Sequence, residues 1–151
     1  MMEMDKKIFV AGHKGMVGSA IVRRLKQLGA SHIITASREQ LDLTNQNRVN
    51  SFFQKHKFSY VYNAAAKVGG IVSNEKHPAD FILENLTIQN NIAAACLDTK
   101  VDRYVFLASC CIYPKLCKQP MREEYLLTGD LEPTNQPYAV AKIAGIVSAQ
   151  A

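Results

Sequence analysis

A glycine-spaced turn between an apolar run and a helix-like stretch constrains the fold of this chain more than any other feature. The run is Lys7–Ala11, and residues 16–28 carry apolar side chains at helical spacing. Glycines here allow a tight turn, a close approach of backbone to a pyrophosphate, and close packing of a helix whose N-terminus attracts anions. We predict a dinucleotide-binding loop, G-x-x-G-x-x-G; a plain glycine-rich turn is the alternative. The residues assigned to this loop are Gly12, His13, Lys14, Gly15, Met16, Val17 and Gly18.

Short apolar runs alternate with longer amphipathic stretches along the rest of the chain, as βαβ units of a parallel sheet do. The further predicted strands are 32–36, 60–65 and 103–109. The further predicted helices are 44–56 with Thr44 as N-cap, 78–99, and 138–150. Right-handed crossovers allow the strand order 3-2-1-4. We predict an α/β fold with a Rossmann-like doubly wound parallel sheet, whose ligand lies where the strand order reverses, beside the first strand.

Length and composition narrow the class of protein further. The 151 residues suit one domain, 1–151, with 21% charged residues and no apolar run near the ~20 residues of a membrane span. No signal-peptide segment is seen, so we expect a cytoplasmic protein without a membrane partner. The basic residues behind the net charge of +5 are scattered, which disfavours nucleic acid and suits an anionic small molecule. The four cysteines are expected to be thiols, and no spacing indicates a metal site.

The end of the second predicted strand bears on the choice of cofactor. NAD sites usually have Asp or Glu there, whereas this chain has Arg38, which suits a 2′-phosphate, and Lys14 adds a second cation. We therefore favour NADP(H), although Glu39 keeps NAD open and Arg38 is alternatively an ordinary surface residue. Asp42 and Leu43 suit the adenine side of the pocket, or simply precede the next helix. Ala64 and Ala65, at the end of the third predicted strand, are assigned to the same cofactor site.

A Y-x-x-x-K motif, Tyr138 to Lys142, begins the last predicted helix. The i, i+4 spacing places both side chains on one face, where an ammonium would lower the pKa of the phenol and make it an acid–base catalyst. Lys142 can also reach the nicotinamide ribose. The motif is common by itself, but Ser109 ends the preceding predicted strand and could hold a substrate carbonyl. Together these residues predict hydride transfer to or from a carbonyl carbon.

Five stretches of the chain carry a resemblance to a known family. They are AGHKGMVGSAI, NAAAKVGGIVSN, PADFILEN, SCCIYPKLCKQPM and LEPTNQPYAVAKIAGI. On these the chain resembles the GDP-L-fucose synthases, extended short-chain dehydrogenases/reductases. The resemblance implies NADPH, a homodimer, and GDP-4-keto-6-deoxy-D-mannose as substrate, epimerised at C3 and C5 and reduced at C4. It implies a triad of Ser109, Tyr138 and Lys142, with Cys111 as an epimerisation acid–base group; a buried small residue is the alternative for Cys111.

The chain departs from that family in three respects. Cys110 replaces an expected serine and Cys117 a small residue, which adds oxidisable sulfur. The family's second epimerisation acid, a histidine of the C-terminal half, has no match in this chain. We therefore expect a fragment or a truncated gene product without the C-terminal substrate domain. Alone, such a chain is expected to be marginally stable and inactive. Lys115 or the cofactor is expected to help Cys111 ionise. Another nucleotide-sugar epimerase or dehydratase, or a non-catalytic NADP(H)-binding module, are the alternatives.

Overall fold

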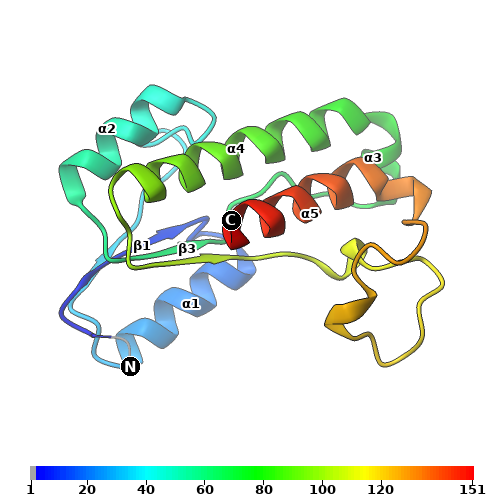
Figure 1. Cartoon of the computed structure of the whole chain (residues 1–151). Helices are drawn as coiled ribbons and strands as arrows, with labels where there is room; N and C mark the ends of the chain where they lie inside the picture. The colour runs from blue at the N-terminus through cyan, green and yellow to red at the C-terminus, as the bar shows by residue number, and fades with distance from the viewer. Residues whose placement is uncertain (1–2) are drawn as a thin grey trace. The chain divides into compact units, whose positions relative to one another are not determined.

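The structure, a computed structural model, describes residues 3–151 (Figure 1). The chain divides into two compact units. The first contains the residues through Ala66 together with Thr87–Leu107, and the second contains Lys67–Leu86 and Ala108–Ala151. The helix α4 (Pro78–Asp98) contributes to both. Within residues 3–151, no helix has the length and apolar character of a membrane span.

The first unit holds a parallel sheet of four strands, which confirms the predicted α/β class. The strands are β1 (Lys7–Ala11), β2 (His32–Ile34), β3 (Tyr60–Asn63) and β4 (Arg103–Phe106). Their order is β2-β1-β3-β4, so the predicted order 3-2-1-4 is wrong. The crossover rule fixes the hand of a connection and not the side on which the next strand is added. Here β3 is the more buried strand and takes an inner position, and β2 lies at the edge.

Alternation along β1 divides the core of the first unit into two layers. Ile8 and Val10 face α1 (Met16–Gln27), together with Leu25 of that helix. Phe9 and Ala11 face the opposite layer, built from α2 (Gln46–His56) and the C-terminal part of α4. Figure 1 shows α1 on one side of the sheet and α2 and α4 on the other. The sheet is therefore doubly wound, as predicted, and its strand order reverses between β1 and β3.

The ends of the helices agree with the sequence to within a few residues. Gly29 has φ of 84° just after α1, a left-handed conformation that favours glycine at the end of a helix. The N-cap of α2 is Asn45, whose side chain accepts a hydrogen bond from the Arg48 N–H, and not Thr44 as predicted. Thr44 instead donates its hydroxyl to Asp42 at 2.7 Å. The strands β2, β3 and β4 are each two or three residues shorter than predicted.

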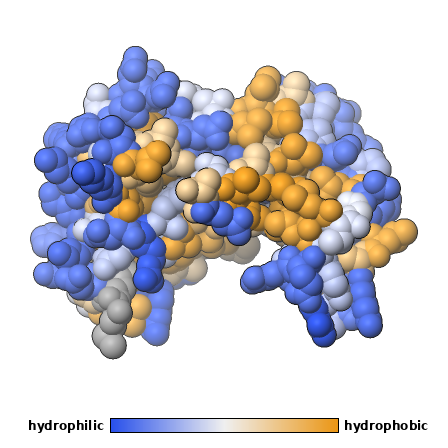
Figure 2. Space-filling view, viewed as in Figure 1, coloured by the Kyte–Doolittle hydropathy of each residue, from blue (hydrophilic) through white to orange (hydrophobic). Residues whose placement is uncertain are grey.

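The second unit is built from short helices and turns around one longer helix. That helix is α5 (Gln136–Gln150), which begins two residues before the predicted start. The helix α3 (Ile71–Lys76) was not predicted, because six residues with no capping side chain give little periodic signal. Three 3₁₀ turns, η1 (Cys110–Ile112), η2 (Glu123–Tyr125) and η3 (Pro133–Asn135), precede α5 in the chain, where no helix was predicted. Figure 2 shows apolar side chains gathered over α5, where Val140 and Val147 are exposed.

Candidate functional site

The glycine loop has the geometry of a turn that only glycine can make at two positions. Gly12 has φ of 76°, and a side-chain carbon there would stand 2.6 Å from the Ala64 carbonyl oxygen. A side-chain carbon on Gly18 would collide with the Gly12 carbonyl, so the close packing of Gly18 is against the loop and not against the sheet. At Gly15 the same carbon would meet only the Gly12 carbonyl, at 3.3 Å. The loop thus packs tightly at its ends and is open at its middle.

The N-terminus of α1 is left available for an anion. Its N-cap is Gly15, so no side chain caps the helix, and its first turn contains no acidic residue. The side chains of Met16 and Val17 are exposed, so a ligand at this end would be met by backbone N–H groups. His13 is partly buried and Lys14 exposed in the same loop. Free N–H groups and the helix dipole together favour a phosphate group.

The carboxyl ends of β1 and β3 meet beside this loop. The Ala64 N–H donates to the Ala11 carbonyl at 3.1 Å, and the Ala65 N–H donates to the Asn63 side chain at 3.2 Å. Asn63 is fully buried and donates its own amide to the Tyr104 hydroxyl at 3.1 Å. Burial raises the pKa of Tyr104 to about 12, so its hydroxyl stays protonated. Asn63 therefore fixes the turn that carries Ala64 and Ala65, a role that the sequence analysis missed.

The turn after β2 gathers charges around two carboxylates. Ser37 donates to Glu39 at 2.6 Å; this bond lowers the pKa of Glu39 most, and the charges of Lys14 and Arg38 act in the same direction. Hydrogen bonds from Thr44 lower the pKa of Asp42, with a smaller contribution from Arg38. The charges of Lys14 and Arg38 therefore both act on Glu39. Leu43 is partly buried and packs on the core of this unit.

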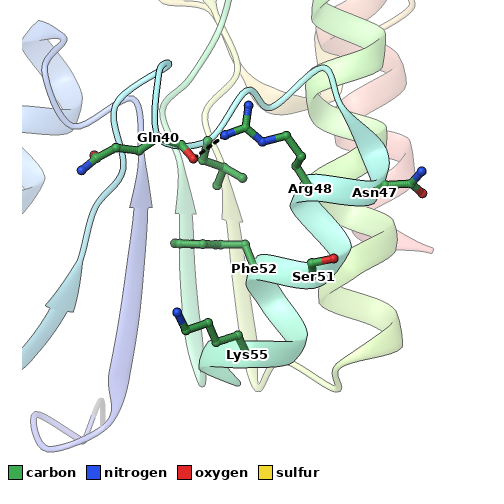
Figure 3. Close-up of a pocket in the computed structure, with 7 residues that line it drawn as sticks. Gln40, Asn47, Arg48, Ser51, Phe52 and Lys55 are labelled. Atoms are coloured by element: carbon green, nitrogen blue, oxygen red, sulfur yellow. Dashed lines mark hydrogen bonds between the residues drawn. The ribbon is translucent and has the colours of Figure 1, made fainter.

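A second arginine, which the sequence analysis did not single out, holds this turn in place. Arg48 on α2 donates to the Gln40 carbonyl at 2.8 Å and more weakly to that of Glu39 (Figure 3). These bonds form one wall of a surface pocket of about 370 Å³ whose other side is α2. Its lining residues are Gln40, Leu41, Asn47, Arg48, Ser51, Phe52 and Lys55, none of which was assigned to the cofactor site. Arg48 therefore stabilises the turn after β2 by hydrogen bonds to two of its backbone carbonyls.

In the second unit, Ser109 hydrogen-bonds Cys111, and both residues influence the pKa of Tyr138. Ser109 lies three residues beyond the end of β4, at the N-cap of η1, and not within a strand as predicted. Its hydroxyl donates to the Cys111 sulfur at 3.4 Å, and Ser109 also acts on Tyr138, whose pKa it lowers. Tyr138 stands in the first turn of α5 and packs edge-to-face on the buried ring of Phe81, at 6.5 Å between ring centres. Two groups able to exchange protons therefore share one serine.

Lys142 lies one turn along α5 from Tyr138, with Nζ 5.9 Å from the centre of the Tyr138 ring. It is buried, and burial lowers its pKa to about 8. Burial likewise raises the pKa of Tyr138, opposed by the bond to Ser109 and aided by the nearby thiols of Cys111 and Cys110. The prediction that Lys142 lowers the pKa of this phenol is therefore wrong for this structure. The largest cause of the shift is burial of the phenol itself, which disfavours the phenolate.

The sulfur of Cys111 has a neighbour that the sequence analysis did not identify. Asn135, the last residue of η3, donates its side-chain amide to Cys111 Sγ at 3.2 Å. The expectation that Lys115 assists Cys111 is not supported, because its ammonium pairs with Glu132 at 2.9 Å. Cys110 is exposed and Cys117 partly buried, and all four cysteines are free thiols. The groups that contact the Cys111 sulfur are thus Ser109 and Asn135.

The turn before α3 is tied to the helix segment that carries Phe81. Asn85 accepts a hydrogen bond from the Lys67 N–H at 3.0 Å and donates to the Lys67 carbonyl at 2.9 Å. The Lys67 ammonium pairs with Glu84 at 3.1 Å and lies over the Phe81 ring. A side-chain carbon on Gly69 would stand 2.8 Å from the same ring. Phe81 is thereby fixed between this turn and Tyr138, a support that no sequence motif marked.

The predicted site residues thus fall into two groups. The first unit holds the glycine loop, Arg38, Asp42, Leu43, Ala64 and Ala65, and the second holds Ser109, Cys111, Tyr138 and Lys142. Each group is compact within its own unit. The first offers backbone N–H groups and cations to an anionic ligand. The second offers a phenol, a thiol and a buried amine for proton exchange.

Comparisons with known proteins place these groups in a family. Residues 8–151 match the model of the NAD dependent epimerase/dehydratase family. The GDP-L-fucose synthase of Escherichia coli (strain K12) is 53% identical over 141 residues, which are 93% of this chain and 44% of that protein. A putative GDP-L-fucose synthase 2 of Arabidopsis thaliana is 54% identical over 151 residues, 100% of this chain and 46% of that protein. The predicted resemblance is confirmed, and the chain spans less than half the length of these curated relatives.

A solved structure agrees with the fold over almost the whole chain. A GDP-mannoheptose C4 reductase from Campylobacter jejuni, solved with NADP bound, matches with a TM-score of 0.93 and 41% identity. The match covers 97% of this chain and 46% of that one. The Rossmann-like architecture is therefore shared with this GDP-mannoheptose C4 reductase.

Proposed function

Because this chain belongs to the NAD dependent epimerase/dehydratase family, we propose that it forms the cofactor-binding part of an NADPH-dependent GDP-sugar epimerase/reductase. The proposed reaction converts GDP-4-keto-6-deoxy-D-mannose into GDP-L-fucose, by epimerisation at C3 and C5 and reduction at C4. The observation that carries the proposal is that Ser109 hydrogen-bonds Cys111 and, together with Cys111, influences the pKa of Tyr138. Epimerisation and reduction need two different proton-exchanging groups at one sugar, and this arrangement supplies a thiol and a phenol.

The residues of the first unit fit a nicotinamide dinucleotide phosphate. The uncapped N-terminus of α1 and the open backbone at Gly15 would hold the pyrophosphate. Arg38 and Lys14, whose charges both act on Glu39, would hold a 2′-phosphate. Asp42, Leu43, Ala64 and Ala65 would line the adenosine side. When bound, NADPH supplies the hydride for the C4 carbon.

Cys111 is proposed to exchange protons at C3 and C5. The C4 ketone acidifies these protons, because an adjacent carbonyl accepts the electron pair that their removal leaves behind. Asn135 and Ser109 donate hydrogen bonds to the sulfur, which supports a thiolate as the form that takes the proton. We propose a second acid outside this chain for the opposite face of the sugar.

Tyr138 is proposed to give its proton to the C4 oxygen during reduction, with Ser109 as a second hydrogen-bond donor to that oxygen. The raised pKa of Tyr138 keeps the phenol protonated and so suits an acid. Lys142, buried beside it, is proposed to contact the nicotinamide ribose. Residues 1–151 are proposed to form a single NADP(H)-binding domain, and the exposed Val140 and Val147 on α5 support a homodimer through this helix.

The test joins this chain to the C-terminal half of the Escherichia coli GDP-L-fucose synthase. The fusion should consume NADPH in the presence of GDP-4-keto-6-deoxy-D-mannose and release GDP-L-fucose, measured by NADPH absorbance and chromatography. Cys111→Ser should slow uptake of deuterium from heavy water at C3 and C5. A folded fusion that binds NADPH but forms no GDP-L-fucose would reject the substrate, and unchanged deuterium uptake in Cys111→Ser would reject the role of the thiol.

A second candidate substrate is a GDP-heptose with a ketone at C4. The structural match to the Campylobacter jejuni GDP-mannoheptose C4 reductase favours it. Both candidate substrates would be reduced at C4, and they differ in the part of the sugar beyond C5. The same fusion assayed with both sugars separates them, because the preferred one has the larger kcat/KM.

A further inference from the structure

Asn135 stands where an asparagine ordinarily caps a helix, yet it does not cap one. It is the N-cap residue of α5, with φ of −131° and ψ of 17°, and its side chain makes no hydrogen bond to the first turn of that helix. An N-cap asparagine normally accepts a bond from the backbone N–H two or three residues on. Here the side chain is turned to Cys111 instead, where its amide donates to Sγ at 3.2 Å. The local sequence therefore gives up a helix cap in favour of a contact with sulfur.

The other end of the same amide is also unusual. The Asn135 side-chain oxygen is buried and has no hydrogen-bond partner among residues 3–151. A buried, unpaired amide oxygen destabilises a fold, and native structures contain few of them. Asn135 is thus a poor choice for stability alone. Its remaining polar contact is the one with the Cys111 sulfur.

Of the two hydrogen-bond donors to the Cys111 sulfur, Asn135 is the one that is not needed by another acceptor. The Ser109 hydroxyl lies 3.4 Å from Sγ, but it carries a single hydrogen, for which the proposed function gives it a second acceptor. When Ser109 donates to the Tyr138 oxygen or to a substrate, it cannot also donate to sulfur. The amide hydrogens of Asn135 have no such competitor. A neutral thiol is a weak acceptor, whereas a thiolate is a strong one, so a dedicated donor matters most to the charged form.

We propose that Asn135 is a positioning residue that holds the Cys111 sulfur and stabilises its thiolate by an N–H···S hydrogen bond. The inference rests on the proposed function in one respect, since it explains how Cys111 exchanges protons with a sugar. The contact itself requires neither cofactor nor substrate. It can therefore be tested on the 151-residue chain, separately from turnover.

The test compares the rate at which iodoacetamide alkylates Cys111 in the unsubstituted chain and in Asn135→Leu, by mass spectrometry at neutral pH. The thiolate is the reacting form, so loss of the donor should slow alkylation about tenfold or more, the factor that a hydrogen bond to a charged group is worth. The midpoint of thermal unfolding should not fall, because leucine also removes the unpaired oxygen. Cys110 in the same peptide is the internal reference, and Cys96, whose pKa burial raises to about 12, should not react.

Two further variants keep the outcome unambiguous. Asn135→Asp has the same shape without the donor, so it should slow alkylation at least as much, and it replaces the leucine variant if that one fails to fold. Gln136→Ala, the exposed neighbour, should alkylate at the unsubstituted rate. A residue that merely packs would loosen the turn when replaced and speed alkylation. A rate equal to or above the unsubstituted one in either folded Asn135 variant overturns the proposal, whereas failure of the fusion to form GDP-L-fucose overturns the proposed function alone.

Discussion

Lys142 shows how one buried side chain links the site to stability. Burial lowers its pKa from 10.5 to about 8, so the folded chain disfavours the charged form that the unfolded chain retains. The cost, about 3 kcal/mol, is complete below pH 8 and disappears as pH rises towards 10.5. We predict that Lys142→Met is more stable than the unsubstituted chain by a margin that shrinks by about 2 kcal/mol from pH ~7.5 to pH ~9.5. Urea denaturation at both pH values measures it; a margin independent of pH contradicts the burial of a titrating lysine.

Arg38 carries the proposed choice between the two nicotinamide cofactors. Its charge and that of Lys14 both act on Glu39, and both are proposed to pair with a 2′-phosphate. We predict that the chain binds NADPH more tightly than NADH, and that Arg38→Ala removes about 1.5–3 kcal/mol of this preference. Titration calorimetry with both cofactors measures it. Arg24→Ala, exposed on α1, is the control and should leave the preference unchanged; equal affinities in the unsubstituted chain would reject the assignment.

At this scale the sequence predicted the residues that stand in motifs and missed those that support them. Ser109, Cys111 and Tyr138 were predicted from spacing and resemblance, and they do form one group. Asn135 was missed because it contacts a residue 24 positions away and because its place in the chain indicates an ordinary helix cap. The pKa of Tyr138 was predicted in the wrong direction, since burial, which spacing does not reveal, outweighs the neighbouring lysine.

In the glycine loop, one glycine is needed for packing and another for the proposed binding of the cofactor. Gly18 packs against the backbone of Gly12, whereas the open side of Gly15 meets one carbonyl at 3.3 Å. We predict that Gly18→Ala destabilises the chain by at least about 2 kcal/mol, because backbone must move, while Gly15→Ala costs less than half as much. Gly15→Ala should nevertheless weaken NADPH binding, since its methyl group would stand where the pyrophosphate is proposed to bind. Thermal unfolding and cofactor titration measure the two effects; equal loss of stability in both variants contradicts this division.

The N-cap of α2 lies one residue later in the structure than the sequence predicted. Asn45, and not Thr44, accepts the bond from the Arg48 N–H that closes the first turn. We predict that Asn45→Ala destabilises the chain by about 1 kcal/mol, the usual worth of an N-cap. Asn47→Ala, the matched change on the exposed side of the same helix, should be neutral or slightly stabilising because alanine favours helices. Chemical denaturation measures both, and an Asn45→Ala chain of unchanged stability would contradict the cap.

Helices and strands with strong apolar periodicity were predictable from the sequence. Features that depend on neighbouring elements, such as the strand order, were not. The strand β1 and the helices α1 and α4 begin and end within a residue of the predicted positions. The strand order was not predictable, because the pattern of each strand is compatible with either side of β1. In the observed order, the turn after β3, with Ala64 and Ala65, lies beside the glycine loop. The predicted order had placed the end of β4 there. The helix α3 is too short to show a period.

For the molecule as a whole, the two units divide the proposed work between them. The first carries what a dinucleotide phosphate needs, a free helix N-terminus and two cations. The second carries the thiol, phenol and serine that a sugar ketone needs. Both lie within the stretch, residues 8–151, that matches the family. The account therefore predicts that epimerisation and reduction depend on different residues of one chain and can be uncoupled by single substitutions.

The most direct test of this claim is the deuterium content and NADPH consumption of the Tyr138→Phe fusion with GDP-4-keto-6-deoxy-D-mannose in heavy water. Loss of the phenol proton should slow reduction at C4 by a factor of about 10²–10⁴, the usual contribution of a general acid. Deuterium should still enter C3 and C5 at the unsubstituted rate, because Cys111 is intact, and NADPH should still bind. A Tyr138→Phe fusion that consumes NADPH as fast as the unsubstituted fusion would contradict the account.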